Sequence, residues 1–107
     1  MAFLRKFQGT GQLGATETAM YAPTGNAVGT IGVLTFYNTS TTAQVEVTVY
    51  APNTGTGARI LEKFVLNPEK SHICRPAINQ VIESGYQISG LASSGSVVDY
   101  TCSGAEE

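Results

Sequence analysis

The residues best suited to chemistry are a histidine and a cysteine two positions apart, His72 and Cys74, with a second cysteine, Cys102, near the C-terminus. Residues i and i+2 of a β-strand project from the same face, so this spacing allows the imidazole to contact the thiol. Thiol catalysis needs such a contact. A zinc site needs three or four ligands at fixed spacing, and at most these three are available. We therefore predict no metal-binding residues and no thiol catalysis.

The other chemical motifs are weaker still. The stretch from Gly9 to Gly14 matches the dinucleotide fingerprint G-x-G-x-x-G, but no helix pattern follows it, and no acidic residue lies about 20 positions on. A glycine-rich turn is the better interpretation. The carboxylates are scattered singly, which does not promote a paired-carboxylate glycosidase site; they are Glu17, Glu46, Glu62, Glu69, Glu83 and Asp99. We predict a protein that is not an enzyme, with no catalytic or cofactor-binding residues and no cofactor.

Composition favours a single domain with a weakly charged surface. The chain has 107 residues, of which 13% are charged, and a net charge of −2. The charged share is about half of the usual one, and threonine, serine and glycine replace the missing ionic side chains. This balance does not steer the chain toward nucleic acid or an anionic membrane. It fits self-association or docking on a large assembly, and it fits a plain soluble domain equally well.

The N-terminus lacks the pattern of an export signal. Met1-Ala2-Phe3-Leu4 is followed at once by Arg5 and Lys6, with no apolar segment after them. No run approaches the roughly 18 apolar residues of a membrane span. We expect synthesis in the cytoplasm without secretion, where Cys74 and Cys102 would be free, buried thiols. A disulfide between them is the alternative, since both lie on expected strands that could be neighbours.

The elements that position these residues are organised around the segment Thr30–Pro52. Its second half alternates Val45, Val47 and Val49 with polar residues, which predicts a strand with one buried face. Its first half is apolar on both faces, which predicts a central strand. The short polar residues at 38–42 favour a turn between the two halves.

The first half of this segment sets the expected pairing. Leu34 and Phe36 lie on one face, and Ile31 and Val33 lie on the other, if the strand is regular. A hairpin that sets Phe36 against Val45, and Leu34 against Val47, would bring the apolar groups together. We expect Val45, Val47, Val49, Leu34 and Phe36 to be buried.

Further alternating stretches predict the remaining strands, near 3–7, 17–21, 59–66, 71–77, 86–91 and 97–102. The first is short, charged and terminal, which is typical of the edge of a sheet. The segment 76–85 is the one helix candidate, of one or two turns. With about seven or eight short strands, the chain is predicted to be all-β, a single antiparallel β-sandwich over residues 1–107, either Ig-like or jelly-roll-like, with at most one short helical turn.

Several stretches, taken in order, carry a resemblance that covers nearly the whole chain. They are Gly11-Gln12-Leu13, Met20-Tyr21-Ala22-Pro23, Ile31 through Ser40, the three valines above, Arg59-Ile60-Leu61, Ile82 through Ile88, Val97-Val98 and Ser103 through Glu106. In these stretches the chain resembles the small β-sandwich virion proteins of tailed bacteriophages, which include head-decoration, head-fibre and tail-accessory proteins. Such proteins commonly carry an acidic residue where this chain has Tyr86, and the two cysteines are not part of their pattern.

The resemblance implies a non-enzymatic structural protein of the virion. It implies a late protein that is made in the host cytoplasm, is not secreted, and becomes part of the particle. The first expectation is a capsid decoration or accessory protein that forms a homo-oligomer, with a trimer as one option, and docks on the major capsid protein or other virion proteins. A neck or tail accessory protein is the alternative within the virion. No nucleic acid and no membrane are expected as partners.

The N-terminal strand supplies the expected contact residues. Phe3, Leu4 and Phe7 are apolar groups on a terminal strand of an otherwise polar surface, so we predict that they contact other copies or the particle. The alternative is that they close the core of the sandwich itself.

Two other classes of function would leave visible signs. A carbohydrate- or ligand-binding module would show a concave patch with exposed tyrosines, such as Tyr37, Tyr50 or Tyr86. A small hydrolase would bring His72 together with a carboxylate.

Overall fold

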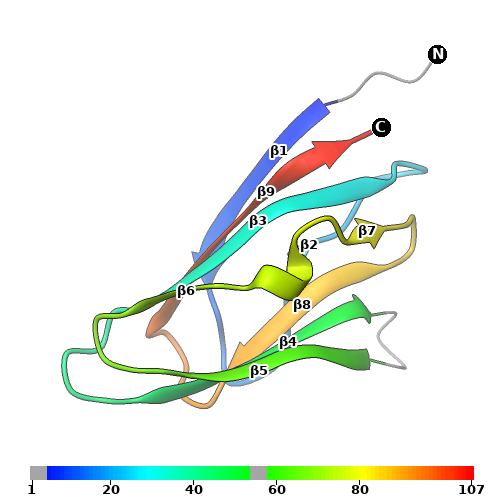
Figure 1. Ribbon diagram of the computed structural model, residues 1–107. Coiled ribbons are helices and arrows are strands. Elements are labelled where there is room, and N and C mark those ends of the chain that lie inside the picture. Colours follow the sequence, from blue (N-terminus) through cyan, green and yellow to red (C-terminus); the bar gives the residue numbers. More distant parts are fainter. Residues whose placement is uncertain (1–4, 54–57) are drawn as a thin grey trace.

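The computed structural model describes residues 5–53 and 58–107 as two antiparallel sheets packed face to face (Figure 1). The predicted all-β sandwich is confirmed, with nine strands in the described residues instead of seven or eight. The helix candidate is reduced to one turn of 3₁₀ helix, η1 (Arg75–Ala77). The strands are β1 (Arg5–Gln12), β2 (Thr18–Tyr21), β3 (Gly29–Asn38), β4 (Val45–Asn53), β5 (Ala58–Leu66), β6 (Ser71–Ile73), β7 (Val81–Ile82), β8 (Gln87–Ala92) and β9 (Val98–Glu106).

The strand order identifies the jelly-roll form of the sandwich. Sheet A has the order β1-β9-β3-β6, with β7 also paired to β3, and sheet B has the order β2-β8-β4-β5. The chain passes repeatedly from one sheet to the other, which is the jelly-roll topology and not the Ig-like one. Strands β1 and β9 pair along their whole length, from Arg5 opposite Glu106 to Gln12 opposite Asp99. The first and last described strands therefore lie side by side (Figure 1).

The core lies between the sheets and contains the predicted apolar residues. Val45, Val47 and Val49 on β4 are at most 1% exposed, and Leu34 and Phe36 on β3 are equally buried. Strand β3 is flanked by β9 on one side and by β6 and β7 on the other, so it is central, as expected.

The predicted hairpin is wrong, because its two halves belong to different sheets. Phe36 lies in sheet A, whereas Val45 lies in sheet B and pairs with Leu66 of β5. The linking segment is held by the buried side chain of Asn38, which donates to the carbonyl oxygens of Ala43 at 2.9 Å and Leu66 at 3.0 Å. These hydrogen bonds satisfy two carbonyl groups at the place where the chain passes from sheet A to sheet B. The chain therefore continues into the other sheet and does not turn back to pair with β3.

The predicted faces of β3 also need one correction. Ile31 is fully buried, on the same side as Leu34, although a regular strand would place them on opposite faces. The pairing of β3 with β9 shifts between Ile31 and Val33. This β-bulge at Gly32 adds one residue and rotates the preceding part of the strand, so that Ile31 also enters the core.

The glycine-rich segment is a strand and not the predicted turn. Gly9 and Gly11 lie within β1, and β1 is an edge strand, as expected for the N-terminal segment. A Cβ atom on Gly11 would lie 2.9 Å from the hydroxyl oxygen of Tyr100 on the neighbouring strand. Glycine at this position therefore makes room for the ring of Tyr100 between the sheets.

Candidate functional site

The single histidine contacts a carboxylate across the two sheets. His72 on β6 and Glu62 on β5 are joined by a hydrogen bond of 2.9 Å between Nε2 and Oε1. The ring of Phe64 stacks on the imidazole, with 3.9 Å between ring centroids. Sequence reasoning missed this pair, because ten positions and a change of sheet separate the two residues. The hydrogen bond joins the edge strands of the two sheets, and the ring of Phe64 covers one side of the imidazole.

The two cysteines are free and fully buried, as predicted. They lie on opposite sides of β3: Cys102 is the register partner of Leu34, and the N–H of Cys74 donates to the carbonyl of Leu34 at 2.9 Å. Since neighbouring strands are about 4.8 Å apart, the Cα atoms of the two cysteines are about 10 Å apart. A disulfide requires Cα atoms within roughly 7 Å, so the alternative of a Cys74–Cys102 bridge does not fit this fold.

Burial keeps both thiols protonated. The pKa of Cys74 is raised to about 12, mainly because burial removes the hydration of the thiolate and secondly because the carboxylate of Glu62 is nearby. Burial also raises the pKa of Cys102 to about 11. The thiolate is the reactive form of cysteine, so neither residue is a nucleophile at neutral pH. The contact of His72 with Glu62 ties the two sheets together. It is also the histidine–carboxylate pair named above as a sign of a hydrolase, and the thiol of Cys74 beside it is protonated and supplies no nucleophile.

These thiols predict a loss of stability in alkali. In the unfolded chain both would ionise near pH 9.0, whereas in the folded chain they ionise near pH 11 and 12. Their stabilising effect is therefore complete below pH 9 and is lost as the pH rises through the folded values. Between pH 9 and 11 the free energy of unfolding should fall by about 1.4 kcal/mol per pH unit for each thiol.

Urea unfolding at pH 8 and pH 10.5, compared between the wild type and Cys102→Ala, measures this effect. We expect the variant to lose about half of the pH-dependent decrease. Alkylation provides an independent check, with no labelled cysteine in the native protein at pH 8 and two after denaturation without reductant. Rapid labelling of both cysteines in the native state, or equal pH dependence of the two proteins, would contradict the burial argument.

Phe7 packs on residues of its own chain at the other lateral edge of the sandwich. Its ring stacks on Tyr21 of β2, with centroids 3.8 Å apart and planes 5° apart, and the hydroxyl of Tyr21 donates to Glu106 at 2.5 Å. Phe7 is half-buried against the core, as the core-closing alternative expects, and its role in particle contact stays a prediction. Phe3 and Leu4 lie outside the described residues.

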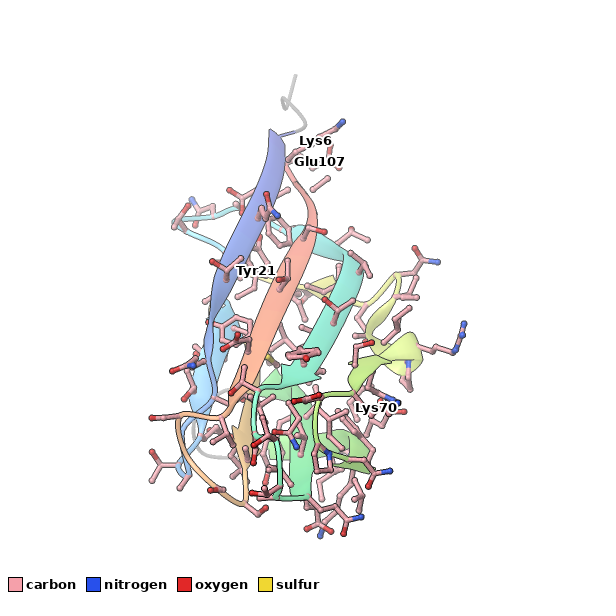
Figure 2. The ribbon with its side chains drawn as sticks, turned by 90° about the vertical axis from the view of Figure 1, so that its left-hand side faces the viewer. Lys6, Tyr21, Lys70 and Glu107 are labelled. Atoms are coloured by element: carbon pink, nitrogen blue, oxygen red, sulfur yellow. The ribbon has the colours of Figure 1, made fainter. Side chains whose placement is uncertain are left out.

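Strand β1 leaves one row of backbone groups pointing away from the sheet. Its neighbour is β9, and the described residues contain no strand on its other side. The N–H of Leu13 donates to the carbonyl of Val98 at 2.9 Å. Bonding direction alternates along an antiparallel strand, so the odd-numbered residues bond to β9. The N–H and C=O groups of Lys6, Gln8, Thr10 and Gln12 consequently point outward from the margin of sheet A. Figure 2 shows β1 at this margin, with Lys6 near the end of the sandwich that also holds Glu107.

The other edge strands carry features that discourage pairing. Strand β2 has four residues and a register shift, and β6 has three residues. Strand β5 is longer but carries the charged residues Glu62 and Lys63 at its centre. Short length, bulges and charges are the usual protections of an edge. Strand β1 has eight residues and no charged side chain from Phe7 to Gln12, so it is the least protected edge in the described part of the chain.

The outer surface offers weak support for a ligand-binding module. A hollow of about 590 Å³ crosses β1, β9 and β3, and small residues such as Gly32, Ser103 and Ala105 form part of its lining. The tyrosines that would form a binding platform are not gathered there. Tyr37 lies on β3 of sheet A, and Tyr50 lies on β4 of sheet B.

Two further searches cover the residues from 5 to 53 and from 58 to 107. They contain no group of three or more histidine, cysteine, aspartate or glutamate side chains placed to hold a metal ion. No helix in this part of the chain is both long enough and apolar enough to cross a bilayer.

Comparison with known proteins shows the fold and no family. No family model and no curated protein matches the sequence. The chain is similar in structure to a chain of the Bacillus endospore appendages, with a TM-score of 0.51 and 14% identity over 97% of this chain and 85% of the other. PirA is also similar, with a TM-score of 0.44 and 7% identity over 98% of this chain and 94% of the other. A chain of the infectious bursal disease virus (IBDV) particle is similar as well, with a TM-score of 0.46 and 12% identity. That match covers 96% of this chain and 30% of the viral one.

Proposed function

We propose that this chain is a non-enzymatic structural protein of a bacteriophage virion, a capsid decoration or accessory protein that binds copies of itself and docks on the particle. The observation that carries the proposal is the edge of β1, the least protected edge in the described part of the chain. An edge with free N–H and C=O groups is a template for pairing with another chain. A soluble domain that works alone would be expected to block such an edge.

The fold and the sequence support the virion as the setting. Jelly rolls are common in viral capsid proteins, and the sequence resembles small virion proteins of tailed phages along nearly its whole length. The chain is accordingly proposed to be made in the host cytoplasm and to join the particle there. The major capsid protein is the proposed docking partner, with a neck or tail position as the alternative.

The buried cysteines favour non-covalent assembly. The Bacillus endospore appendages, which share the fold, form disulfide-linked pili. In this chain Cys74 and Cys102 are both fully buried, and they are not placed to link one molecule to another. Assembly through strand edges and the N-terminal segment needs no such linkage. Phe3, Leu4 and Phe7 remain the proposed contact residues of that segment.

Binding to particles tests the proposed function. Tailed phage particles produced without this chain are mixed with the purified protein and sedimented. We expect the protein to sediment with the particles and to reach saturation at a fixed number of copies per particle. Imaging of the saturated particles then distinguishes a capsid position from a neck or tail position. A protein that stays in the supernatant and remains monomeric at every concentration would overturn the proposal.

The contact residues are tested in the same assay. The variant Phe3→Ala/Leu4→Ala is compared with Phe7→Ala. If the segment is adhesive, the double variant loses particle binding while its melting temperature stays unchanged. Phe7→Ala should lower the melting temperature, because it removes the stack on Tyr21. Full particle binding by the folded double variant would exclude Phe3 and Leu4 as contact residues.

A further inference from the structure

We propose that β1 of one molecule pairs antiparallel with β1 of a second copy, about a two-fold axis that passes between their Gly9 residues. The inference rests on the proposed function, because it specifies the surface and the partner of the proposed self-association. Sheet A of the two molecules would then form one continuous sheet.

The backbone of β1 is suited to this register. The outward groups belong to Lys6, Gln8, Thr10 and Gln12, since the odd-numbered residues bond to β9. With Gly9 opposite Gly9, Gln8 faces Thr10 of the second copy, and Lys6 faces Gln12. The two-fold axis repeats both pairs, so the interface contains four of them. Each pair can exchange two hydrogen bonds, which gives roughly eight bonds in total. The register uses nearly all of β1. At every even-numbered position it sets the outward N–H and C=O groups of one copy against those of the other.

The charges also favour a second copy. The side-chain amide of Gln12 donates to the carboxylate of Asp99 on β9 at 2.9 Å. In the proposed register Lys6 of one molecule lies beside Gln12 of the other, so its ammonium group approaches the Asp99 carboxylate of that other molecule. The two-fold axis repeats this contact at both ends of the interface. Opposite charges on neighbouring strands stabilise their pairing.

The glycine at the axis removes a steric obstacle. Residues opposite each other in a non-hydrogen-bonded pair have Cα atoms about 4.5 Å apart. Gly9 has no side chain, and the space at its Cβ position is bounded by the carbonyl oxygen of Met20 at 3.5 Å. Two glycines can therefore meet at the axis without displacing the contacts of β1 with β2.

The two registers nearest the centre of β5, the other long edge, are unfavourable for the same two-fold pairing. A register centred on Glu62 sets two glutamates opposite each other, and a register centred on Lys63 does the same with two lysines. Like charges directly opposite each other destabilise a strand pair. Strand β1 places no charged residue opposite a like charge in its proposed register.

The variant Thr10→Lys tests the interface against a matched control. Thr10 is exposed on β1, and Thr101 is its register partner on β9, so Thr101→Lys adds the same charge one strand away from the edge. We expect Thr10→Lys to raise the dimer dissociation constant at least about tenfold, because it brings a new lysine diagonally beside Lys6 of the opposite copy, at both ends of the interface. Thr101→Lys should change the constant by less than about threefold. Sedimentation equilibrium measures both constants, and thermal melting confirms that each variant is folded.

Amide exchange gives a signature that a loss of folding would not imitate. The N–H groups of Gln8, Thr10 and Gln12 should become protected as the concentration rises, whereas those of Phe7, Gly9 and Gly11 should be protected at every concentration. Residue-specific exchange by NMR separates the two sets. Equal protection of both sets in the monomer would overturn the edge assignment.

The outcomes separate this inference from the proposed function. The β1 interface is overturned if the Thr10→Lys variant dimerises as well as the wild type and the N–H groups of Gln8, Thr10 and Gln12 still exchange in the dimer. The proposed function is left standing by that result. A monomer that binds particles through β1, and loses this binding in Thr10→Lys, shows that β1 pairs with a different virion protein and overturns the second copy as partner. A monomer that joins no particle overturns both proposals.

Discussion

Replacement of Val47 by aspartate is expected to abolish folding. Val47 is fully buried on β4, where it pairs with Phe64 of β5 and Ala92 of β8. An aspartate there would place a carboxylate among apolar groups with no partner, at a cost of several kcal/mol. The total stability of a domain of this size is about 5–15 kcal/mol, so the loss removes most or all of it.

The variant Val65→Asp is the matched control for this prediction. Val65 lies on the neighbouring strand and is 54% exposed, so the same substitution leaves the new carboxylate in water. We expect its melting temperature to stay within a few degrees of the wild type. Circular dichroism during heating distinguishes the two variants. A soluble Val47→Asp protein with a cooperative melting transition would show that the inner face of β4 is assigned wrongly.

A single methyl group added at Gly104 is expected to cost about 3 kcal/mol of stability. A Cβ atom there would collide with the backbone carbonyl oxygen of Thr30, and would lie 2.8 Å from Cζ of Phe7 and 3.0 Å from the backbone nitrogen of Gly32. Side chains can move aside, but Thr30 and Gly32 belong to the central strand β3. The backbone of β3 cannot withdraw without weakening its pairing with β9. The melting temperature of Gly104→Ala should therefore fall by more than about 10 °C.

Gly95→Ala provides the comparison. The nearest atom to a Cβ on Gly95 is the backbone nitrogen of Ala15 at 3.5 Å, which is an ordinary contact distance. We expect a change within about 0.5 kcal/mol. Chemical unfolding of the two alanine variants under identical conditions measures the difference. Equal stability of Gly104→Ala and Gly95→Ala would mean that β9 and β3 lie further apart than the structure places them.

Properties that depend on one strand at a time could be predicted from the sequence. Alternation from Val45 to Val49 predicted a strand with one buried face, because side chains of any strand alternate between its two faces. The short, charged segment near residues 3–7 predicted a terminal edge strand, because charge on a strand discourages further pairing. Cys74 and Cys102 were predicted to be free, buried thiols, and the fold places both in the core.

Which strands are neighbours could not be predicted from the sequence and is known from the fold. Phe36 and Val45 were expected to face each other in a hairpin, but Asn38 holds the chain as it crosses to the other sheet. Alternation within a strand is equally satisfied by either arrangement, so it carries no information about the partner. The contact of His72 with Glu62 is of the same kind, because it joins edge strands of two sheets.

The bulge at Gly32 and the free edge of β1 also depend on distant parts of the chain. Ile31 is buried because the pairing of β3 with β9 shifts by one residue, and a local pattern cannot register a shift against a strand some 70 positions away. The row of outward groups on Lys6, Gln8, Thr10 and Gln12 exists because β9 bonds to the other side of β1. Whether an edge is left open is settled by the order of the strands in the sheet, which is set by packing of the two sheets around one core.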